Sequence, residues 1–314
     1  MSNGVRRVGI LVGRERSFPD ALIARVAAKD AGVVADYARI DITRIDAPPP
    51  YDVLVDRISH DVPSYQPVLK IAALHGARVV NNPFWRIADD KFFNAGLAAK
   101  LGVAVPKTAV LPSKSHGPDI TSGSLANLVY PLDWDGLVRD FGFPMFVKPH
   151  WGGGFRDVTR VSNLEELLRA YDASGRLTMI VQEGIEWSAY VRCIVIGQEE
   201  VRIALWDPRL GHFDRYVRAA ESMAPLDAAL QERVERDART LCRALGYDMN
   251  TVEFAIRDGV PYAIDFMNSA PDFDVSSLGP ENFEWVVDRM ADLVIRLAKA
   301  EKASHARAEE LLPV

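Results

Sequence analysis

Cysteine is scarce in this chain, whose 314 residues include only Cys193 and Cys242. Two cysteines form neither a disulfide framework nor a zinc cluster, so the sequence fits a reducing compartment. Free cysteine is among the residue types most often buried, and both thiols are therefore expected in the core.

Long apolar segments are also missing. No stretch approaches the roughly 20 apolar residues that are needed to cross a bilayer. The two arginines in residues 1–7 are not followed by an apolar stretch with a cleavage site, as they would be in a secretory signal. The sequence therefore predicts a cytoplasmic protein with no membrane partner.

Positive charge does not predominate. The 37 Lys and Arg residues face 43 Asp and Glu residues, which gives a formal net charge of -6 and a pI near 5.6. Proteins that bind the nucleic-acid backbone normally present a basic surface, so no nucleic-acid partner is expected. Any phosphate site must therefore be local. The sequence contains no Walker-type phosphate loop, and it shows no internal repeat and no heptad pattern.

The amino-terminal region alternates short apolar segments with helical patterns. The predicted strands cover residues 7–13, 34–40, 51–58 and 77–80, and the predicted helices cover residues 19–31 and 65–75. Strands that alternate with helices indicate a mostly parallel sheet with helices on its faces. The fold class predicted for this region is α/β.

The remaining chain reads as a mixture of strands and helices around a polar loop at residues 112–131. Helices are predicted over residues 85–101, 133–141, 163–171, 226–245 and 282–300. Strands are predicted near residue 108 and over residues 145–150, 157–161, 179–184, 190–196, 200–206, 251–257 and 261–267. Asp258-Gly259 joins the last two strands and is a hairpin signal.

The strongest local motif is Phe146-Val147-Lys148-Pro149-His150-Trp151-Gly152-Gly153-Gly154. A loop of three glycines exposes its backbone amides and can close over an anion, and the lysine beside it supplies positive charge. The alternative is a flexible turn after a strand. The fragment alone does not decide between the two.

The order of the motifs on either side of the glycine loop favours the anion-binding interpretation. Asn82-Pro83, Asp90-Lys91 and Pro106-Lys107-Thr108 precede the glycine loop, whereas Val181-Gln182-Glu183-Gly184-Ile185, Glu253 and Asp265-Phe266-Met267-Asn268 follow it. Over residues 82–274 this order resembles the ATP-grasp superfamily, closest to the branch of ribosomal-protein glutamate ligases, glutathione synthetases and D-alanine ligases.

The resemblance implies three domains and a tail. Residues 1–84 would form a Rossmann-like α/β domain, and residues 85–178 a central α+β subdomain with the glycine-rich lid. Residues 179–302 would form the carboxyl-terminal antiparallel-sheet subdomain with the metal site, followed by a charged tail at 303–314.

The resemblance also implies the nucleotide site. Lys91 and Lys148 would hold the phosphates beneath the lid of Gly152, Gly153 and Gly154. Without the family, a lone lysine such as Lys91 would be read as a solvated residue on a helix.

The adenine hinge would lie at residues 182–185. Gln182 and Glu183 would lie beside the adenine, and the Ile185 amide would donate to its ring, although an ordinary buried strand also explains this apolar segment. Glu186 is the nearest acid to hold the ribose hydroxyls. The position where relatives often carry that acid falls instead at Ala189 or Tyr190.

Magnesium would be held by Glu253 and Asp265, on the two strands of the predicted hairpin. Nearby carboxylates repel unless a cation or a proton neutralises them, and magnesium prefers oxygen ligands. The family often has an acid, one residue and then asparagine, whereas here two residues separate Asp265 from Asn268. Either a bulge brings Asn268 to the metal or Asn268 has another role.

Two arginines complete the predicted catalytic set. Arg192 lies within an apolar strand, where burial demands an anionic partner. It matches an arginine that related ligases use near the phosphates or the acyl intermediate, although a structural ion pair would also explain it. Arg202 lies on the next strand and is expected to face the same cleft. Asp272 and Asp274 would either attract an amine or cap their loop.

The predicted activity is an ATP- and Mg2+-dependent ligation of a carboxylate to an amine or thiol through an acyl phosphate, with release of ADP and phosphate. The predicted partners are small-molecule substrates, including a peptide, and a second copy of the chain in a homodimer. Two alternatives stay open: an ATP-grasp small-molecule kinase and a non-catalytic nucleotide-binding protein.

Overall fold

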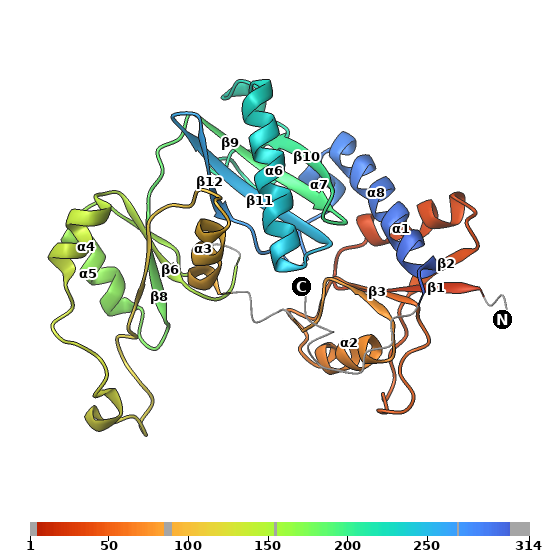
Figure 1. Ribbon diagram of the computed structural model, residues 1–314, viewed down its shortest axis with the longest axis horizontal. Coiled ribbons are helices and arrows are strands. Elements are labelled where there is room, and N and C mark those ends of the chain that lie inside the picture. The colour runs from red at the N-terminus through yellow and green to blue at the C-terminus, as the bar shows by residue number, and fades with distance from the viewer. Residues whose placement is uncertain (1–4, 85–89, 154–155, 269, 302–314) are drawn as a thin grey trace. The chain divides into compact units, whose positions relative to one another are not determined.

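The computed structural model describes residues 5–84, 90–153, 156–268 and 270–301 (Figure 1). The chain divides into two compact units. The first contains the described residues within Met1–Arg86, Ser188–Pro261 and Asp265–Val314, and the second those within Ile87–Trp187 and Tyr262–Ile264.

A parallel sheet forms the amino-terminal part of the first unit. Its strand order is β2-β1-β3-β4. The strands are β1 (Arg6–Leu11), β2 (Val33–Tyr37), β3 (Val53–Asp56) and β4 (Arg78–Val80). Val53 and Val55 belong to the core with helices α1 (Ser17–Ala28) and α8 (Pro280–Lys299), whereas Leu54 belongs to the core beneath α2 (Tyr65–Leu74). This alternation explains why the strands read as continuous apolar runs: both faces are covered.

The first unit also carries a sheet with the order β10-β9-β11-β12, in which β9 pairs antiparallel with β10 and β11. Its strands are β9 (Ala189–Ile196), β10 (Glu200–Leu205), β11 (Met249–Arg257) and β12 (Val260–Asp265). Asp258 and Gly259 both have positive φ angles, 53° and 70°, as the predicted tight hairpin requires.

Helix α6 (Ala228–Leu245) packs on β9, β10 and β11. Asp227 begins it by accepting a hydrogen bond from the Leu230 amide, and Gly246 ends it with φ of 64°. Cys193 and Cys242 are both fully buried, which confirms the prediction that they are core residues. Burial raises the pKa of each thiol.

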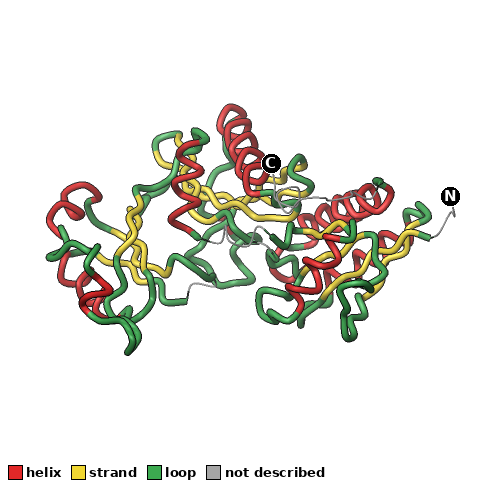
Figure 2. The backbone as a smooth tube through the Cα atoms, turned by 60° about the horizontal axis from the view of Figure 1, so that its bottom comes forward, coloured by secondary structure: helices red, strands yellow, loops and turns green. Residues whose placement is uncertain are grey.

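The second unit contains an antiparallel sheet in the order β5-β8-β6-β7 (Figure 2). Its strands are β5 (Thr108–Leu111), β6 (Met145–Pro149), β7 (Thr159–Val161) and β8 (Met179–Glu183), and its helices are α3 (Lys91–Lys100), α4 (Trp134–Phe141) and α5 (Leu164–Ala173). Met145, Val147 and Val181 point toward the core formed with α4 and α5. Lys148 and Gln182, which alternate with them, therefore belong to the opposite face.

Among the described residues, the predicted order of α-helices and strands is confirmed, with two differences. The last strand ends at Asp265 rather than at residue 267, because the Asn250 side chain donates to the Phe266 carbonyl at 2.9 Å and replaces a ladder bond. A short helix, α7 (Val275–Leu278), was not predicted. The proposed tail at residues 303–314 lies outside the described residues.

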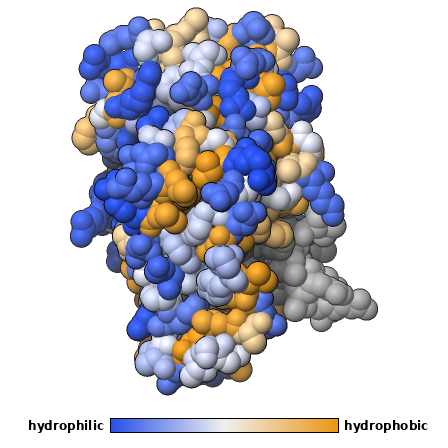
Figure 3. All heavy atoms as spheres, turned by 90° about the vertical axis from the view of Figure 1, so that its left-hand side faces the viewer, coloured by the Kyte–Doolittle hydropathy of each residue, from blue (hydrophilic) through white to orange (hydrophobic). Residues whose placement is uncertain are grey.

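Among the described helices, none has both the length and the apolar character that a bilayer crossing demands. On the face shown in Figure 3, apolar side chains form small groups between hydrophilic ones.

Candidate active site

The structure brings Lys91 to the glycine loop within the second unit. Asp90 caps α3 by accepting from the amides of Phe92 and Phe93, so Lys91 becomes the first residue of the helix. The Lys91 amide donates to the His150 carbonyl at 2.9 Å, and its Nζ donates to the Gly152 carbonyl. The lysine and the loop, which lie 61 residues apart in the sequence, are therefore direct neighbours.

The glycine loop is open. Gly152 has φ of 93°, which favours glycine, and a Cβ atom built at Gly152 or Gly153 would meet nothing within 4 Å. Trp151 is half exposed beside it. Gly154 lies outside the described residues. The open space around Gly152 and Gly153 is compatible with the close approach of an anion to the backbone.

Lys148 is buried rather than solvated. Its side chain projects from β6 on the face away from α4 and α5, and its Nζ donates to the Gln182 Oε1 atom of β8 at 2.9 Å. Gln182 in turn lies 3.3 Å from the Thr108 hydroxyl. Packing therefore orients the ammonium group and Gln182 holds it, so its position is fixed before any ligand arrives.

The predicted hinge follows β8. The amides of Glu183 and Gly184 donate to the carbonyls of Lys107 and Pro144 at 2.9 and 2.8 Å. Within the described part of the chain, the Ile185 amide donates to no backbone carbonyl. Glu186 is exposed.

A buried acid and a buried arginine face each other in the first unit. Arg192 of β9 and Glu253 of β11 are paired in the ladder, and the Arg192 Nε atom lies 3.4 Å from Glu253 Oε1. The Tyr190 hydroxyl donates to Glu253 Oε2 at 2.9 Å. One oxygen of the Glu253 carboxylate thus faces the Arg192 guanidinium group, and the other accepts the hydrogen bond from Tyr190.

Burial raises the pKa of Glu253 to about 7, against the lowering influence of Arg192. The nearby Asp265 raises this pKa further, while the hydrogen bond from Tyr190 and the charge of Arg215 lower it. Asp265 therefore lies close enough to Glu253 to affect its ionisation. The structure therefore brings the two predicted metal ligands into electrostatic contact.

Asn268 is held beside the same strand. The backbone amide of Asn268 donates to the Asn250 Oδ1 atom at 2.9 Å, and the side-chain Nδ2 atom donates to the Thr251 carbonyl at 3.3 Å. Within the described ranges, no three His, Cys, Asp or Glu side chains are grouped to hold a metal ion. Glu253 and Asp265 offer only hard oxygen donors, so they fit magnesium as part of a shell that other oxygens complete.

No protein-family model matches the chain. A D-alanine–D-alanine ligase from Ralstonia nicotianae is 26% identical over 275 residues, which cover 77% of this chain and 82% of that protein. The crystal structure of the D-alanine–D-alanine ligase from Bacillus anthracis complexed with ATP aligns over 93% of this chain and 96% of that one, with a TM-score of 0.64 and 18% identity. A RimK domain ATP-grasp protein from Sphaerobacter thermophilus aligns over 92% and 99%, with a TM-score of 0.63 and 17% identity.

The chain has the ATP-grasp fold. The predicted superfamily, branch and fold class are confirmed.

The structure gives Arg202 a different set of contacts from Arg192. Its Nε atom donates to Asn282 Oδ1 and its terminal nitrogen to Glu281 Oε1, both at 2.5 Å, at the start of α8. Arg202 nevertheless lies on the same face of the sheet as Arg192. It pairs with Ile194, which is two residues along β9 from Arg192, and residues two apart in a strand share a face. The contacts formed by Arg202 are with α8, not with Glu253.

The sequence predicts substrate-binding residues in the variable loop at residues 206–216 but singles out no residue there, and the structure places three of its side chains beside the acid cluster: Trp206, Arg215 and Tyr216. Trp206 is only 2% exposed and lies beneath the guanidinium groups of both Arg192 and Arg215. Burial raises the pKa of Tyr216 to about 12 against the lowering effect of Arg192. The available signal was the mixture of aromatic and basic residues after an apolar strand, which is unusual for an ordinary surface loop.

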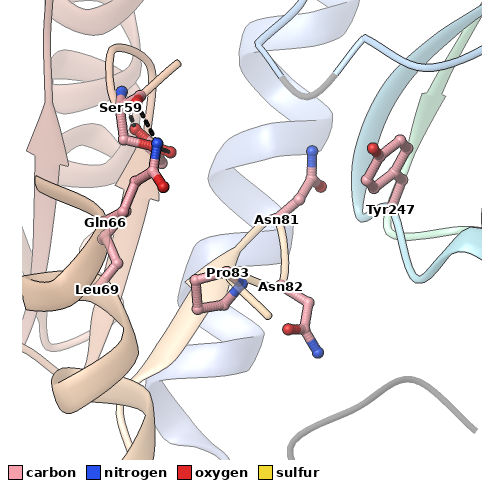
Figure 4. Close-up of a pocket in the computed structure, with 8 residues that line it drawn as sticks. Ser59, Gln66, Leu69, Asn81, Asn82, Pro83 and Tyr247 are labelled. Atoms are coloured by element: carbon pink, nitrogen blue, oxygen red, sulfur yellow. Dashed lines mark hydrogen bonds between the residues drawn. The ribbon is translucent and has the colours of Figure 1, made fainter. Parts of the chain in front are cut away.

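A small polar pocket lies at the carboxyl ends of β3 and β4 (Figure 4). It holds about 20 Å³, the space of a single water molecule. Its polar groups are largely satisfied: Asp56 accepts from the Ser59 amide at 2.8 Å, and Gln66 donates to the Ser59 carbonyl at 3.1 Å. Asn81 exchanges hydrogen bonds with the Met249 backbone at 2.7 and 2.8 Å, so its role there is structural.

Proposed function

We propose that this protein is an ATP-dependent ligase that joins a carboxylate to an amine, or to a thiol, through an acyl phosphate. Its relatives by sequence are D-alanine–D-alanine ligases, matched over three quarters of the chain, and this similarity carries the proposal. The carboxylate oxygen attacks the terminal phosphorus of ATP and ADP leaves. The amine then attacks the acyl carbon, and the C–O bond to phosphate breaks.

The second unit supplies the nucleotide-binding residues in this proposal. Lys91 places an ammonium group at the glycine loop and Lys148 places one beside Gln182, and each is oriented by an oxygen of the protein. Gly152, Gly153 and Gly154 would cover the phosphates. The Ile185 amide would donate to the adenine ring beside Gln182 and Glu183, and Glu186 would bind the ribose hydroxyls.

The first unit supplies the acids and arginines. Glu253 and Asp265 would hold Mg2+, with Asn268 as a further ligand. The ion would neutralise charge on the phosphates when it is bound. Arg192 and Arg202 would act as catalytic cations on the transferred phosphoryl group. Removal of one such preorganised donor typically reduces the rate about 100- to 1000-fold.

The remaining assignments belong to the same proposal. We assign residues 1–84, 85–178 and 179–302 to an amino-terminal domain, a lid subdomain and a metal-binding subdomain. The substrates are small molecules, the acceptor class includes short peptides, and a homodimer is the expected assembly. A cytoplasmic location follows from the buried free thiols.

A substrate screen tests the activity. Acids and amines are combined pairwise with ATP and Mg2+, beginning with amino acids because the relatives are named for D-alanine. ADP and phosphate release are measured, and the product mass is determined. The expected product is the two substrates minus water. A product that retains a phosphoryl group would establish a kinase instead, and AMP release would contradict both.

A further inference from the structure

Thr108 of β5 lies beside two residues of the candidate nucleotide site in the second unit. It pairs directly with Gln182 of β8 in the antiparallel ladder. Lys148 of β6 pairs with Ile180, which is two residues along β8 from Gln182. Directly opposed residues, and residues two apart in a strand, share a face of the sheet. Thr108, Gln182 and Lys148 therefore lie together on the face opposite the apolar core of this unit.

Three hydrogen bonds connect these side chains in a line. The Lys148 Nζ atom donates to Gln182 Oε1 at 2.9 Å, and the Gln182 Nε2 atom donates to the Thr108 hydroxyl at 3.3 Å. The Thr108 hydroxyl donates to the Pro106 carbonyl at 2.9 Å. Lys148 and Gln182 are only 8% and 6% exposed. The line thus starts at a buried cation and ends on a backbone oxygen.

The direction of this line is fixed by its two ends. An ammonium group only donates hydrogen bonds, and a carbonyl oxygen only accepts them. Because the Thr108 hydroxyl gives its single proton to the Pro106 carbonyl, it acts as an acceptor toward Gln182. The Gln182 amide then has one favourable orientation, with its nitrogen toward Thr108 and its oxygen toward Lys148. The reversed amide would set its NH2 group against the ammonium group, with two donors facing each other.

The Thr108 hydroxyl therefore determines which atom Gln182 presents to Lys148. Without the hydroxyl, the buried amide nitrogen of Gln182 would lose this acceptor, and the loss of a partner for a buried donor is costly. The amide would no longer be held in one orientation. The oxygen that orients the Lys148 ammonium group would then be in place for only part of the time.

We propose that Thr108 is a positioning residue, which sets the orientation of Gln182 and thereby places the Lys148 ammonium group for the phosphates of the nucleotide. This inference rests on the proposed function, in which Lys148 binds those phosphates. Thr108 acts through Gln182 rather than by contact with the ligand. Its contribution is preorganisation, because a charge that is already in place need not be reoriented when the ligand binds.

The test is a double-mutant cycle between Thr108→Val and Lys148→Met. Valine keeps the branched shape of threonine and suits a strand, so the half-buried position should tolerate it. In the parent, Thr108→Val should lower kcat/KM for ATP about 3- to 10-fold, as expected for one lost hydrogen bond. In the Lys148→Met background it should change kcat/KM by less than about 1.5-fold, because the group that it positions is gone. An equal loss in both backgrounds would overturn the proposal.

Two further variants show whether the hydroxyl itself is responsible. Thr108→Ser keeps the hydroxyl and removes only the methyl group, so kcat/KM for ATP should stay within about twofold of the parent. Thr159→Val makes the same change as Thr108→Val at an exposed position of β7 in the same sheet, and should behave as the parent. A loss in Thr108→Ser as large as that in Thr108→Val would assign the effect to packing and overturn the proposal.

A binding measurement separates this inference from the proposed function. Tripolyphosphate, which has phosphates but no base, and adenosine, which has the base but no phosphate, are titrated by calorimetry into the parent and into Thr108→Val. The variant should bind tripolyphosphate about 3- to 10-fold more weakly and adenosine equally well. Equal tripolyphosphate affinities, no tripolyphosphate binding by the parent, or a loss confined to adenosine would overturn the proposal. The expected difference without any turnover in the substrate screen would overturn only the ligase.

Discussion

The two groups of candidate residues hold their charges in different ways. In the second unit, Lys148 donates to the neutral amide oxygen of Gln182 and Lys91 to the carbonyl of Gly152. In the first unit, Arg192 faces the charged carboxylate of Glu253 at 3.4 Å. A cation that is oriented by neutral oxygens can still offer its full positive charge to a polyanionic ligand. Where an acid and a base face each other, their opposite charges largely offset one another.

This difference suggests that the two groups of residues have different roles in binding. The lysines are suited to binding phosphates, because the acceptors described for them, the Gln182 side-chain oxygen and the Gly152 carbonyl, carry no net charge. In the acid cluster, by contrast, burial raises the pKa of Glu253 against the lowering influence of Arg192, so each of these two side chains already has a partner of opposite charge. The predictions below test each half of this comparison.

The largest effect is expected at the acids. Asp265→Asn keeps the shape of the side chain and removes one charge from the pair with Glu253. Magnesium-dependent turnover should fall about 100- to 1000-fold, while adenine nucleotide binding by the hinge persists. The measurement is turnover against magnesium concentration, with nucleotide affinity determined by calorimetry.

Asp258→Asn is the control for Asp265→Asn. It makes the same change of charge in the same hairpin, at a φ of 53° that asparagine tolerates. It should behave as the parent. If Asp265→Asn matches the parent at limiting magnesium, the metal site lies elsewhere.

The second effect is expected at Lys148. Lys148→Met replaces a buried aliphatic stem with an apolar chain of similar length, so the melting temperature should change little. Turnover should fall about 100-fold because a fixed positive charge on the phosphates is lost.

Lys114→Met serves as the control for Lys148→Met, because Lys114 is an exposed lysine of the same unit that pairs with Asp172. It should retain parental turnover. Parental activity in Lys148→Met would remove this lysine from the site, and the comparison of the two units would lose its basis.

A third, smaller effect is expected at Asn268. Its Nδ2 atom already donates to the Thr251 carbonyl, so the side chain is fixed whether or not it reaches a metal. Asn268→Ala should reduce magnesium-dependent turnover about tenfold, as is typical of residues that support a metal site. A loss as large as that of Asp265→Asn would make Asn268 an equal ligand.

The smallest effect concerns the stability of the loop that carries Arg215. Hydrogen bonds from Arg209 lower the pKa of Asp207 from 3.8 to about 2. A lowered folded-state pKa contributes stability that is complete above the unfolded value of 3.8 and is lost as the pH falls toward 2. Since Arg209 is largely exposed, Asp207→Asn should reduce the free energy of unfolding at pH 6 by about 1 to 2 kcal/mol.

The pH dependence provides the check on this prediction. The difference between Asp207→Asn and the parent in urea-induced unfolding should shrink between pH 4 and pH 2. Asp41→Asn, at an exposed position, should show no such change. A difference that stays constant over this range would mean that Asp207 acts through packing rather than through its charge.

Most of the fold could be predicted from the sequence because its local signals agree with one another. The apolar strands, the Asp258-Gly259 turn and the cap residues Asp227 and Gly246 each specify one conformation locally. The end of β12 could not be predicted, because the Asn250 side chain, 16 residues away, competes for the Phe266 carbonyl. Such a bond exists only once the strands have paired.

The candidate site was predictable only in part, for a similar reason. Glu253 and Asp265 could be paired because a hairpin joins their strands. The neighbourhood of Trp206 depends instead on a loop that is closed by a hydrogen bond between the backbones of Asp207 and Arg215. No periodicity in the sequence predicts this bond. Burial of Lys148 was also not foreseen, because it depends on the partner Gln182 of a neighbouring strand.

Oxygen transfer from the acid to phosphate tests the central proposal most directly. The acid found in the screen is labelled with ¹⁸O in its carboxylate and converted with unlabelled ATP, and the released phosphate is analysed by mass spectrometry. Because the carboxylate oxygen attacks phosphorus and stays with it when the amine displaces phosphate, each released phosphate should carry one labelled oxygen. Unlabelled phosphate, with the displaced labelled oxygen found in AMP or in water instead, would contradict an acyl-phosphate ligase.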